Sequence, residues 1–495
     1  MSVLMLKTRI DYHTARGDRH IWIWQCHQIY GPYFRDSPNS VIFNSPSAQQ
    51  TIYNAKANVK KAKFYSFWPL NTESVNTWAI TDKLKHARKR RILNAAFSDK
   101  ALRSAEPYLI RHADRWCELL LLGTEAGWSE AKNMADWANY LVFDILGDLC
   151  YARSFAIKEP GPNELKFIPE LICDYMKFQH PLANSPWTPV WLWLKPRGLD
   201  KAMEYMRPQS MKTYFKWVES CLAQRLKEEE DLQSGVVDKS NARKDMFHHI
   251  FQARDPETGN SGYTKGELFS ESDLLIIAGS DTTSTIFAGM FFYMTRFPLV
   301  YEKLTAEIRS TFASSEEVHA GQQLTSCRYL RAFIDETMRM SPPVNSELSR
   351  EVMQGGFTVD GHVFKEGTNI GVSMYSLHHN ESVIQDPYVF RPERWILDEK
   401  NGVTAESIAA AESAFSPFSC GPRACPGKNL AYLEMTITMA KLLYLADVQA
   451  VEGSDLGAGR ADMMWGRRNK MQYQTYDYFV AIRDGPKVQL KARPH

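Results

Sequence analysis

Apolar residues at helical spacing dominate the pattern of the chain. Between residues 108 and 218 the sequence is mostly helical and rich in Leu, Trp and Tyr, with a break at 180–189. A further helix is predicted after Gly427, where Leu430, Leu433, Ile437 and Ala440 recur at helical spacing. The pattern therefore predicts a protein made mainly of helices.

Alternating patterns typical of strands are shorter and lie mostly near the two ends. Residues 27–44 suggest a Gly-Pro turn followed by short strands. Residues 350–364 alternate like a strand pair, with Asp360-Gly361 as the hairpin turn, and residues 471–482 suggest one more β run. The fold class predicted is mainly α with a smaller β region.

The longest mainly apolar stretch is Leu274–Tyr293, which is long enough for a transmembrane helix. A polar cluster, Ser280–Thr285, interrupts it in the middle. Because Asp281 would be costly in hydrocarbon, we expect a long buried helix that carries a polar site.

Composition narrows the classes of function. The 59 Lys and Arg against 57 Asp and Glu give a net charge of +2, which argues against nucleic-acid binding through a global positive charge. No linker rich in Gly, Ser or Pro divides the 495 residues, so one large unit is expected. The eight cysteines are scattered without a C-x-x-C pair, which predicts neither a zinc site nor a disulfide framework and favours a reducing compartment.

The candidate chemistry centres on the loop Phe418–Gly427. Cys425 stands just before the predicted helix, where free N–H groups and the helix dipole favour a thiolate. Gly421 and Gly427 permit tight turns, and Arg423 offers a charge suited to a carboxylate. The residues alone leave several roles open: a metal or redox thiolate, an axial ligand of haem, a buried structural cysteine, or a disulfide with Cys420.

This loop resembles the haem-binding segment of the cytochromes P-450, with Phe418, Gly421, Arg423, Cys425 and Gly427 on the matching positions. The resemblance implies that Cys425 is the axial thiolate ligand of haem b. It also implies the cytochrome P-450 fold, in which the haem lies between a long oxygen-binding helix and the cysteine loop.

Further motifs follow in the order that the family has. Ala278–Thr283 resembles the oxygen-binding helix, which implies that Gly279 lies near the haem and that Asp281 and Thr282 deliver protons to oxygen. Taken alone, this cluster is equally explained by Thr bonding back to the helix. Glu336, Arg339 and Arg394 resemble an ionic knot behind the cysteine loop.

Basic residues are expected to hold the haem propionates. The run 82–97 is helical and basic, and on its own it indicates a solvated face or a localisation signal. The family resemblance instead implies that His86 and Arg90, four residues apart, bind propionates together with Arg350, and that the other basic residues of the run face an electron donor.

Two segments are expected near the substrate pocket. Residues 344–348 should line it, made more polar by Asn345, Ser346 and Glu347 if they point inward. The Trp-rich segment 187–193 has two interpretations, a pocket roof that touches a membrane or a helix packed in the core.

The resemblance covers residues 27–495 as a single haem-thiolate monooxygenase domain, preceded by a segment, 1–26, without a clear membrane anchor. It implies a monomer that inserts one oxygen atom into a bulky apolar or aromatic substrate, using NADPH through cytochrome P-450 reductase, with cytochrome b5 as a further donor. The Tyr30-Gly-Pro and Pro392–Trp395 segments resemble fungal members of specialised metabolism. The expected location is the cytoplasm or the cytoplasmic face of the endoplasmic reticulum, with peripheral membrane contact.

Two alternatives of other classes remain at this point. The same haem could carry out oxidative coupling, ring closure or rearrangement without net oxygen insertion. The chain could also be a haem-binding sensor without turnover, although a sensor has no need of Asp281 and Thr282.

Overall fold

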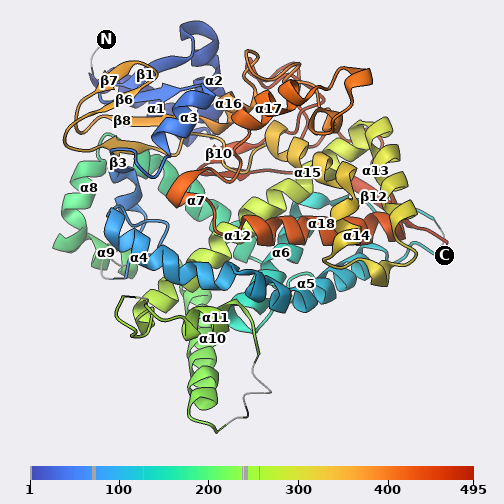
Figure 1. Ribbon diagram of the computed structural model, residues 1–495. Coiled ribbons are helices and arrows are strands. Elements are labelled where there is room, and N and C mark those ends of the chain that lie inside the picture. Colours follow the sequence, from blue (N-terminus) through green and yellow to red (C-terminus); the bar gives the residue numbers. More distant parts are fainter. Residues whose placement is uncertain are drawn as a thin grey trace.

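The computed structural model describes residues 3–69, 74–125, 127–236, 238, 243–255 and 257–494. Helices form the larger part (Figure 1). The helices are α1 (Val3–Ala15), α2 (Arg19–Tyr30), α3 (Pro46–Ile52), α4 (Lys83–Leu93), α5 (Asp99–Leu120), α6 (Met134–Tyr151), α7 (Ile168–Asn184), α8 (Thr188–Leu194), α9 (Leu199–Tyr205), α10 (Gln209–Gln233), α11 (Met246–Gln252), α12 (Lys265–Arg296), α13 (Pro298–Thr311), α14 (Gln322–Ser326), α15 (Arg328–Met340), α16 (Met374–His378), α17 (Ala405–Ala414) and α18 (Lys428–Leu445).

The central helix is α12, 32 residues long, and it packs along α6. It begins with a capping box, in which Thr264 accepts from the amide of Glu267 and the Glu267 side chain accepts from the amide of Thr264. It ends before Pro298, which opens α13. Among the described residues it is the one helix long and apolar enough to cross a membrane, but most of that span is buried inside the protein. The prediction of a long buried helix is confirmed.

The main sheet has the strand order β1-β2-β8-β5-β3 and lies beside α1, α2 and α3 (Figure 1). Its strands are β1 (Tyr33–Ser37), β2 (Ser40–Phe43), β8 (Asn369–Val372), β5 (Arg350–Val352) and β3 (Val59–Lys61). β2 and β8 are parallel, whereas the other neighbours are antiparallel. The sheet brings the segments around residues 61 and 350 together at one edge of the functional site.

Three smaller sheets complete the β region. They are the hairpin β6 (Phe357–Val359) with β7 (His362–Phe364), the hairpin β10 (Tyr476–Tyr478) with β11 (Val480–Ile482), and β4 (Lys132–Asn133) with β12 (Lys487–Ala492) and β9 (Ala446–Ala450). The strands β1, β3 and β8 lie together with β6 and β7 at one side, whereas β12 lies near the C-terminus on the other side (Figure 1). Asp360 and Gly361 both have positive φ at the β6–β7 turn, which confirms the predicted hairpin.

The predicted β run 471–482 is in fact a hairpin that turns at Phe479. The β structure is therefore confirmed for residues 476–482, but the turn was not predicted because it contains neither Gly nor Pro: Phe479 itself adopts a φ of 75°.

The N-terminal segment packs against the rest of the protein. In α2 the side chains of Ile21, Trp22, Ile23 and Trp24 are buried, and the Trp24 indole donates to the Tyr388 hydroxyl at 3.0 Å. The predicted boundary between residues 26 and 27 lies within α2. Residues 19–26 therefore pack as part of the domain that was predicted to begin after them.

The Trp-rich segment forms the short helix α8 at the surface. Trp187 and Trp193 are 63% and 57% exposed, whereas Trp191 packs on an apolar cluster that includes Phe67 and Trp68. The alternative of a helix packed in the core is therefore wrong for Trp187 and Trp193.

Candidate functional site

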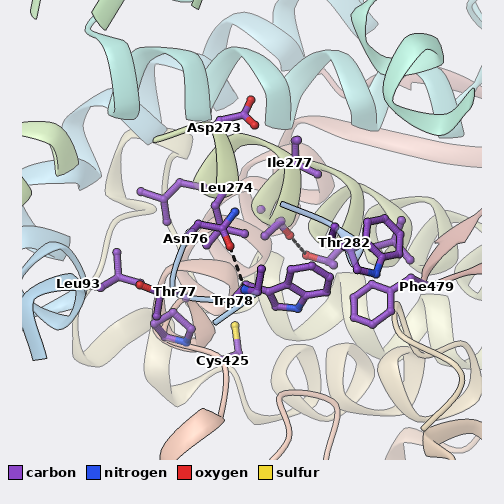
Figure 2. A pocket seen from close by; sticks show the side chains of 18 of the residues that line it. Asn76, Thr77, Trp78, Leu93, Asp273, Leu274, Ile277, Thr282, Cys425 and Phe479 are labelled. Carbon is purple, nitrogen blue, oxygen red and sulfur yellow. Dashed lines mark hydrogen bonds between the residues drawn. The ribbon is translucent and has the colours of Figure 1, made fainter. Parts of the chain in front are cut away.

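A cavity of about 620 Å³ separates α12 from the cysteine loop. Its walls are mostly apolar and come from α4, α7, α10, α12 and the loops 343–348 and 417–427. In Figure 2 the Cys425 sulfur points into this cavity, with Trp78, Thr282 and Phe479 around the same space. The sulfur is open to the cavity, while the surrounding protein excludes bulk water.

Backbone hydrogen bonds fix the cysteine loop. The Cys425 amide donates to the Phe418 carbonyl at 2.9 Å, and the Ala424 amide donates to the Gly421 carbonyl at 3.0 Å. At Gly421 φ is 71°, and an added Cβ would lie 1.9 Å from the Tyr53 carbonyl oxygen. Only glycine fits there, because both the conformation and the space exclude a side chain. At Gly427 a Cβ would make ordinary contacts with Phe97 and Cys425, so the protein itself does not require glycine at that position.

Cys425 stands three residues before the first residue of α18, as predicted. Burial raises the pKa of its thiol, and the amides of Gly427 and Lys428 together with Arg90 lower it without offsetting burial. The amides at the helix start thus act in the predicted direction but are outweighed by burial, and a positive charge bound at the sulfur would favour the thiolate further.

Two loop side chains have clear positions. Phe418 lines the cavity and packs on Tyr432 of α18, with ring centroids 5.3 Å apart. Arg423 donates to the Ile80 carbonyl at 2.7 Å and so ties the loop to the segment before α4.

Five basic side chains meet at one end of the cavity: Lys61, His86, Arg90, Arg350 and Arg423. No ion pair among the described residues includes any of them. Burial and the neighbouring cations lower the pKa of His86 to about 3, and burial and Arg350 lower that of Arg423 to about 10. So much buried positive charge without a carboxylate fits a bound group that carries negative charge.

His86 and Arg90 both line the cavity from α4. The N-cap of this helix is Asp82, whose carboxylate accepts from the Lys85 amide at 2.8 Å. Arg90 also donates to the Ala424 carbonyl beside Cys425. The structure thus brings the predicted His86, Arg90 and Arg350 together.

Lys61 and Tyr65 were missed by the sequence analysis. Lys61 lies 4.1 Å from the centre of the Tyr65 ring and donates to the Trp78 carbonyl. Both residues line the cavity, but no motif marks them. Their position follows only from the pairing of β3 with β5, which places Lys61 opposite Arg350.

On α12 the predicted oxygen motif divides between two environments. Thr282 lines the cavity, and its hydroxyl donates to the Ala278 carbonyl at 2.8 Å (Figure 2). Asp281 is buried outside the cavity lining, and neither carboxylate oxygen has a hydrogen-bond partner among the described residues. Burial raises its pKa to about 6, partly offset by Arg483. The proton-delivery role of Asp281 and Thr282 stays a prediction.

Gly279 lines the cavity and also allows α12 to pack on α6. A Cβ at this position would lie 2.8 Å from Leu146 Cδ1. Gly279 therefore has a packing role, in addition to the predicted role of letting the backbone approach the cofactor.

The ionic knot is present and fully buried. Glu336 accepts two bonds from Arg339, each 2.9 Å long, and one from Arg394 Nε at 3.0 Å. Arg339 also donates to the His378 carbonyl at 2.9 Å, and the His378 ring accepts from the Ser416 amide at 3.1 Å. Because the Ser416 carbonyl accepts from Ser419 at 2.8 Å, this chain of bonds links the knot to the cysteine loop.

The three polar residues predicted to enter the pocket turn away from it. The cavity is lined by Pro343, Val344 and Leu348, whereas Asn345, Ser346 and Glu347 are absent from its wall. Glu347 instead accepts two bonds of 2.7 Å from Arg19. A second cavity-lining segment is the hairpin tip Phe479-Val480, in the C-terminal β stretch whose family counterpart places a loop in the substrate pocket.

These features define a protein with a largely apolar cavity beneath a long helix, a cysteine sulfur open to that cavity, and a basic cluster at one end that fits a negatively charged group. The family model for Cytochrome P450 matches residues 6–457. A cytochrome P450 monooxygenase of Gibberella zeae is 36% identical over 446 residues, which cover 89% of this chain and 97% of the relative. Cytochrome P450 monooxygenase AKT7 of Alternaria alternata is 34% identical over 490 residues, covering 97% of this chain and 89% of the relative.

The chain belongs to the cytochrome P450 family. It is similar in fold to the crystal structure of the cytochrome P450DA heme domain, with a TM-score of 0.71, 15% sequence identity and coverage of 96% of this chain and 93% of the other. The predicted fold class is confirmed. Family and fold imply a haem with a cysteine thiolate ligand, and the described residues fit it: a sulfur facing an apolar cavity and an uncompensated basic cluster.

Proposed function

We propose that this chain is a haem-dependent monooxygenase that inserts one atom of O₂ into a bulky apolar or aromatic substrate, with electrons from NADPH through a reductase. The observation that carries the proposal is the position of the Cys425 sulfur in a cavity that α12 covers with Thr282. The relatives named monooxygenase support the reaction type, and their fungal origin supports a role in specialised metabolism.

The protein residues have separate tasks. Cys425 would supply the thiolate that binds the haem iron, and His86, Arg90, Arg350, Arg423 and Lys61 would hold the propionates. When bound, the haem supplies the activation of dioxygen. The mostly apolar walls exclude water from the reacting carbon, while the Thr282 hydroxyl, already hydrogen-bonded to Ala278, can turn toward the cavity as a proton donor.

Asp281 would supply protons to Thr282 from the buried side of α12. Its raised pKa, about 6, suits a group that takes up and releases a proton near neutral pH. Arg483 lies at this position as well, donating to the Asp281 carbonyl at 3.4 Å.

The electron donor would approach the face of α4 and the cysteine loop. Lys83, Lys85 and Lys428 are exposed there. Arg88 and Lys89, predicted to face the donor, turn inward and pair with Asp255 at 2.8 Å and Glu271 at 3.3 Å. The proposed donor is NADPH-cytochrome P-450 reductase, with cytochrome b5 as an auxiliary donor. The enzyme itself is proposed to act as a monomer.

A peripheral membrane contact through α8 is part of the proposal, at the cytoplasmic face of the endoplasmic reticulum. Exposed Trp187, Val190 and Trp193 lie together, and Arg197 stacks on Trp193 at 4.4 Å. Trp187→Ser with Trp193→Ser should reduce flotation with anionic vesicles, whereas Trp465→Ser, at another exposed Trp, should not.

The test of the reaction uses isotopically labelled O₂ with reductase and NADPH. One labelled oxygen atom per product molecule is expected. Product formed with NADPH consumption but without label would refute oxygen insertion and favour coupling or ring closure.

A further inference from the structure

Asp273 places a carboxylate in the cavity wall remote from the thiolate. It lies on α12, nine residues before Thr282, which at about 1.5 Å per residue is about 13 Å along the helix. Figure 2 shows Asp273 on the opposite side of Leu274 and Ile277 from Cys425. The residue therefore belongs to the part of the cavity wall that is remote from Cys425.

One oxygen of this carboxylate is held and the other is left for a ligand. The Tyr214 hydroxyl of α10 donates to Asp273 Oδ1 at 2.8 Å. This bond fixes the side chain. Among the described residues Asp273 makes no other hydrogen bond, so Oδ2 keeps its acceptor capacity.

No described cation compensates this charge. Asp273 takes part in no ion pair with a residue that the structure describes, and a second carboxylate, Glu219, also lines the cavity. The guanidinium carbon of Arg207 lies 4.8 Å from the centre of the Phe215 ring, and among the described residues Arg207 forms no ion pair with Asp273 or Glu219. Burial raises the pKa of Asp273 to about 6, since the carboxylate lacks a positive partner. The cavity thus has a basic end for the cofactor and an acidic end away from it.

The surroundings of Asp273 suit an alkylated cation. Tyr175, Tyr214, Phe215 and Phe269 also line the cavity; Tyr214 contacts both Asp273 and the Phe215 ring, and Phe269 lies one helical turn before Asp273 on α12. Aromatic faces attract cations, and apolar walls strengthen the attraction of a single carboxylate.

We propose that the Asp273 end of the cavity is a subsite for a positively charged nitrogen of the substrate. The substrate class is a bulky apolar molecule with one basic nitrogen at the end remote from the oxidised carbon. This inference rests on the proposed monooxygenase function, since it assigns the cavity to a substrate.

The test compares two probes in equilibrium dialysis against the haem-loaded enzyme: decyltrimethylammonium, which cannot ligate iron, and neutral 1-decanol. The Asp273→Asn change should weaken binding of the cation at least about tenfold, the range expected for one charge-assisted contact, and leave 1-decanol within about twofold. The fold should tolerate the change, because the amide oxygen can still accept from Tyr214.

Two control variants keep the result interpretable. Glu219→Gln removes the exposed carboxylate of the same wall and should change cation binding less than about twofold, because exposed charges are screened. Tyr214→Phe keeps the Asp273 carboxylate and the aromatic ring but removes the hydrogen bond that orients the carboxylate, so it should weaken cation binding less than Asp273→Asn does. The proposal is overturned if Asp273→Asn has no effect, if it weakens both probes equally, or if Glu219→Gln or Tyr214→Phe weakens cation binding as much.

These outcomes are independent of the proposed reaction. Dialysis needs no turnover, so an enzyme that incorporates labelled oxygen but binds both probes equally would refute the subsite alone. An enzyme that binds the cation through Asp273 but incorporates no label would refute the monooxygenase function alone.

Discussion

Replacing Glu336 by Gln should strongly destabilise the protein, because the carboxylate is the only anion of the buried knot. Burial opposes the ionisation of Glu336, but Arg339 and Arg394 outweigh it and hold its pKa below the ordinary value. Glu336→Gln keeps the volume and removes the charge, which leaves two guanidiniums buried without a counter-ion. Breaking a buried pair in this way costs about 3–5 kcal/mol.

That cost is a large share of the roughly 5–15 kcal/mol that stabilises a typical domain. Urea unfolding of the haem-loaded protein, followed by circular dichroism, should show the lower midpoint. Because Arg339 is linked through His378 to Ser416, the variant should also lose haem faster to an excess of apomyoglobin.

The matched control is Glu393→Gln, which removes a half-buried carboxylate 2.6 Å from Lys303 in the same region. Glu393→Gln should lower the free energy of unfolding by no more than about 1 kcal/mol, as is found for other partly exposed ion pairs. If Glu336→Gln cost no more than this control, the knot would not contribute the stability that its geometry implies.

Three further changes test other parts of the site. Gly421→Ala should abolish haem incorporation, measured as the haem-to-protein absorbance ratio, because its Cβ meets the Tyr53 carbonyl; normal incorporation would contradict the strained loop. Because folding raises the pKa of Asp281 from 3.8 to about 6, this group stabilises the fold below about pH 4 and the stabilisation is lost as the pH rises through 6. Asp281→Asn should therefore exceed wild type in unfolding free energy at pH 7.5 by up to about 3 kcal/mol and match it near pH 4; a difference independent of pH would refute this. Lys61→Met should stabilise the haem-free protein against urea, because burial and neighbouring cations lower the pKa of Lys61, yet speed haem loss several-fold; slower loss would exclude Lys61 from the cofactor site.

The sequence predicted those parts of the site that lie within continuous motifs. The cysteine loop, the polar turn of α12 and the knot each depend on spacing along one or two helices or loops, and each was found at the predicted residues. Local spacing determines such geometry directly.

Residues brought in by pairing between distant segments were not predicted. Lys61 reaches the basic cluster through β3 opposite β5, and Asp273 is one polar residue in an otherwise apolar stretch of α12. The sequence left the direction of Glu347 open, and the side chain turns away from the cavity because Arg19, on α2 and far away in sequence, donates two hydrogen bonds to it. Such competition between long-range partners leaves no local signal.

The central claim is that Cys425 supplies a thiolate to haem, and the carbon-monoxide difference spectrum of the reduced protein tests it most directly. Wild type should show the red-shifted band of a thiolate-ligated haem, and Cys425→Ser should lack it while Cys420→Ser keeps it. A wild-type spectrum without that band, or a Cys425→Ser variant that retains it, would contradict the account.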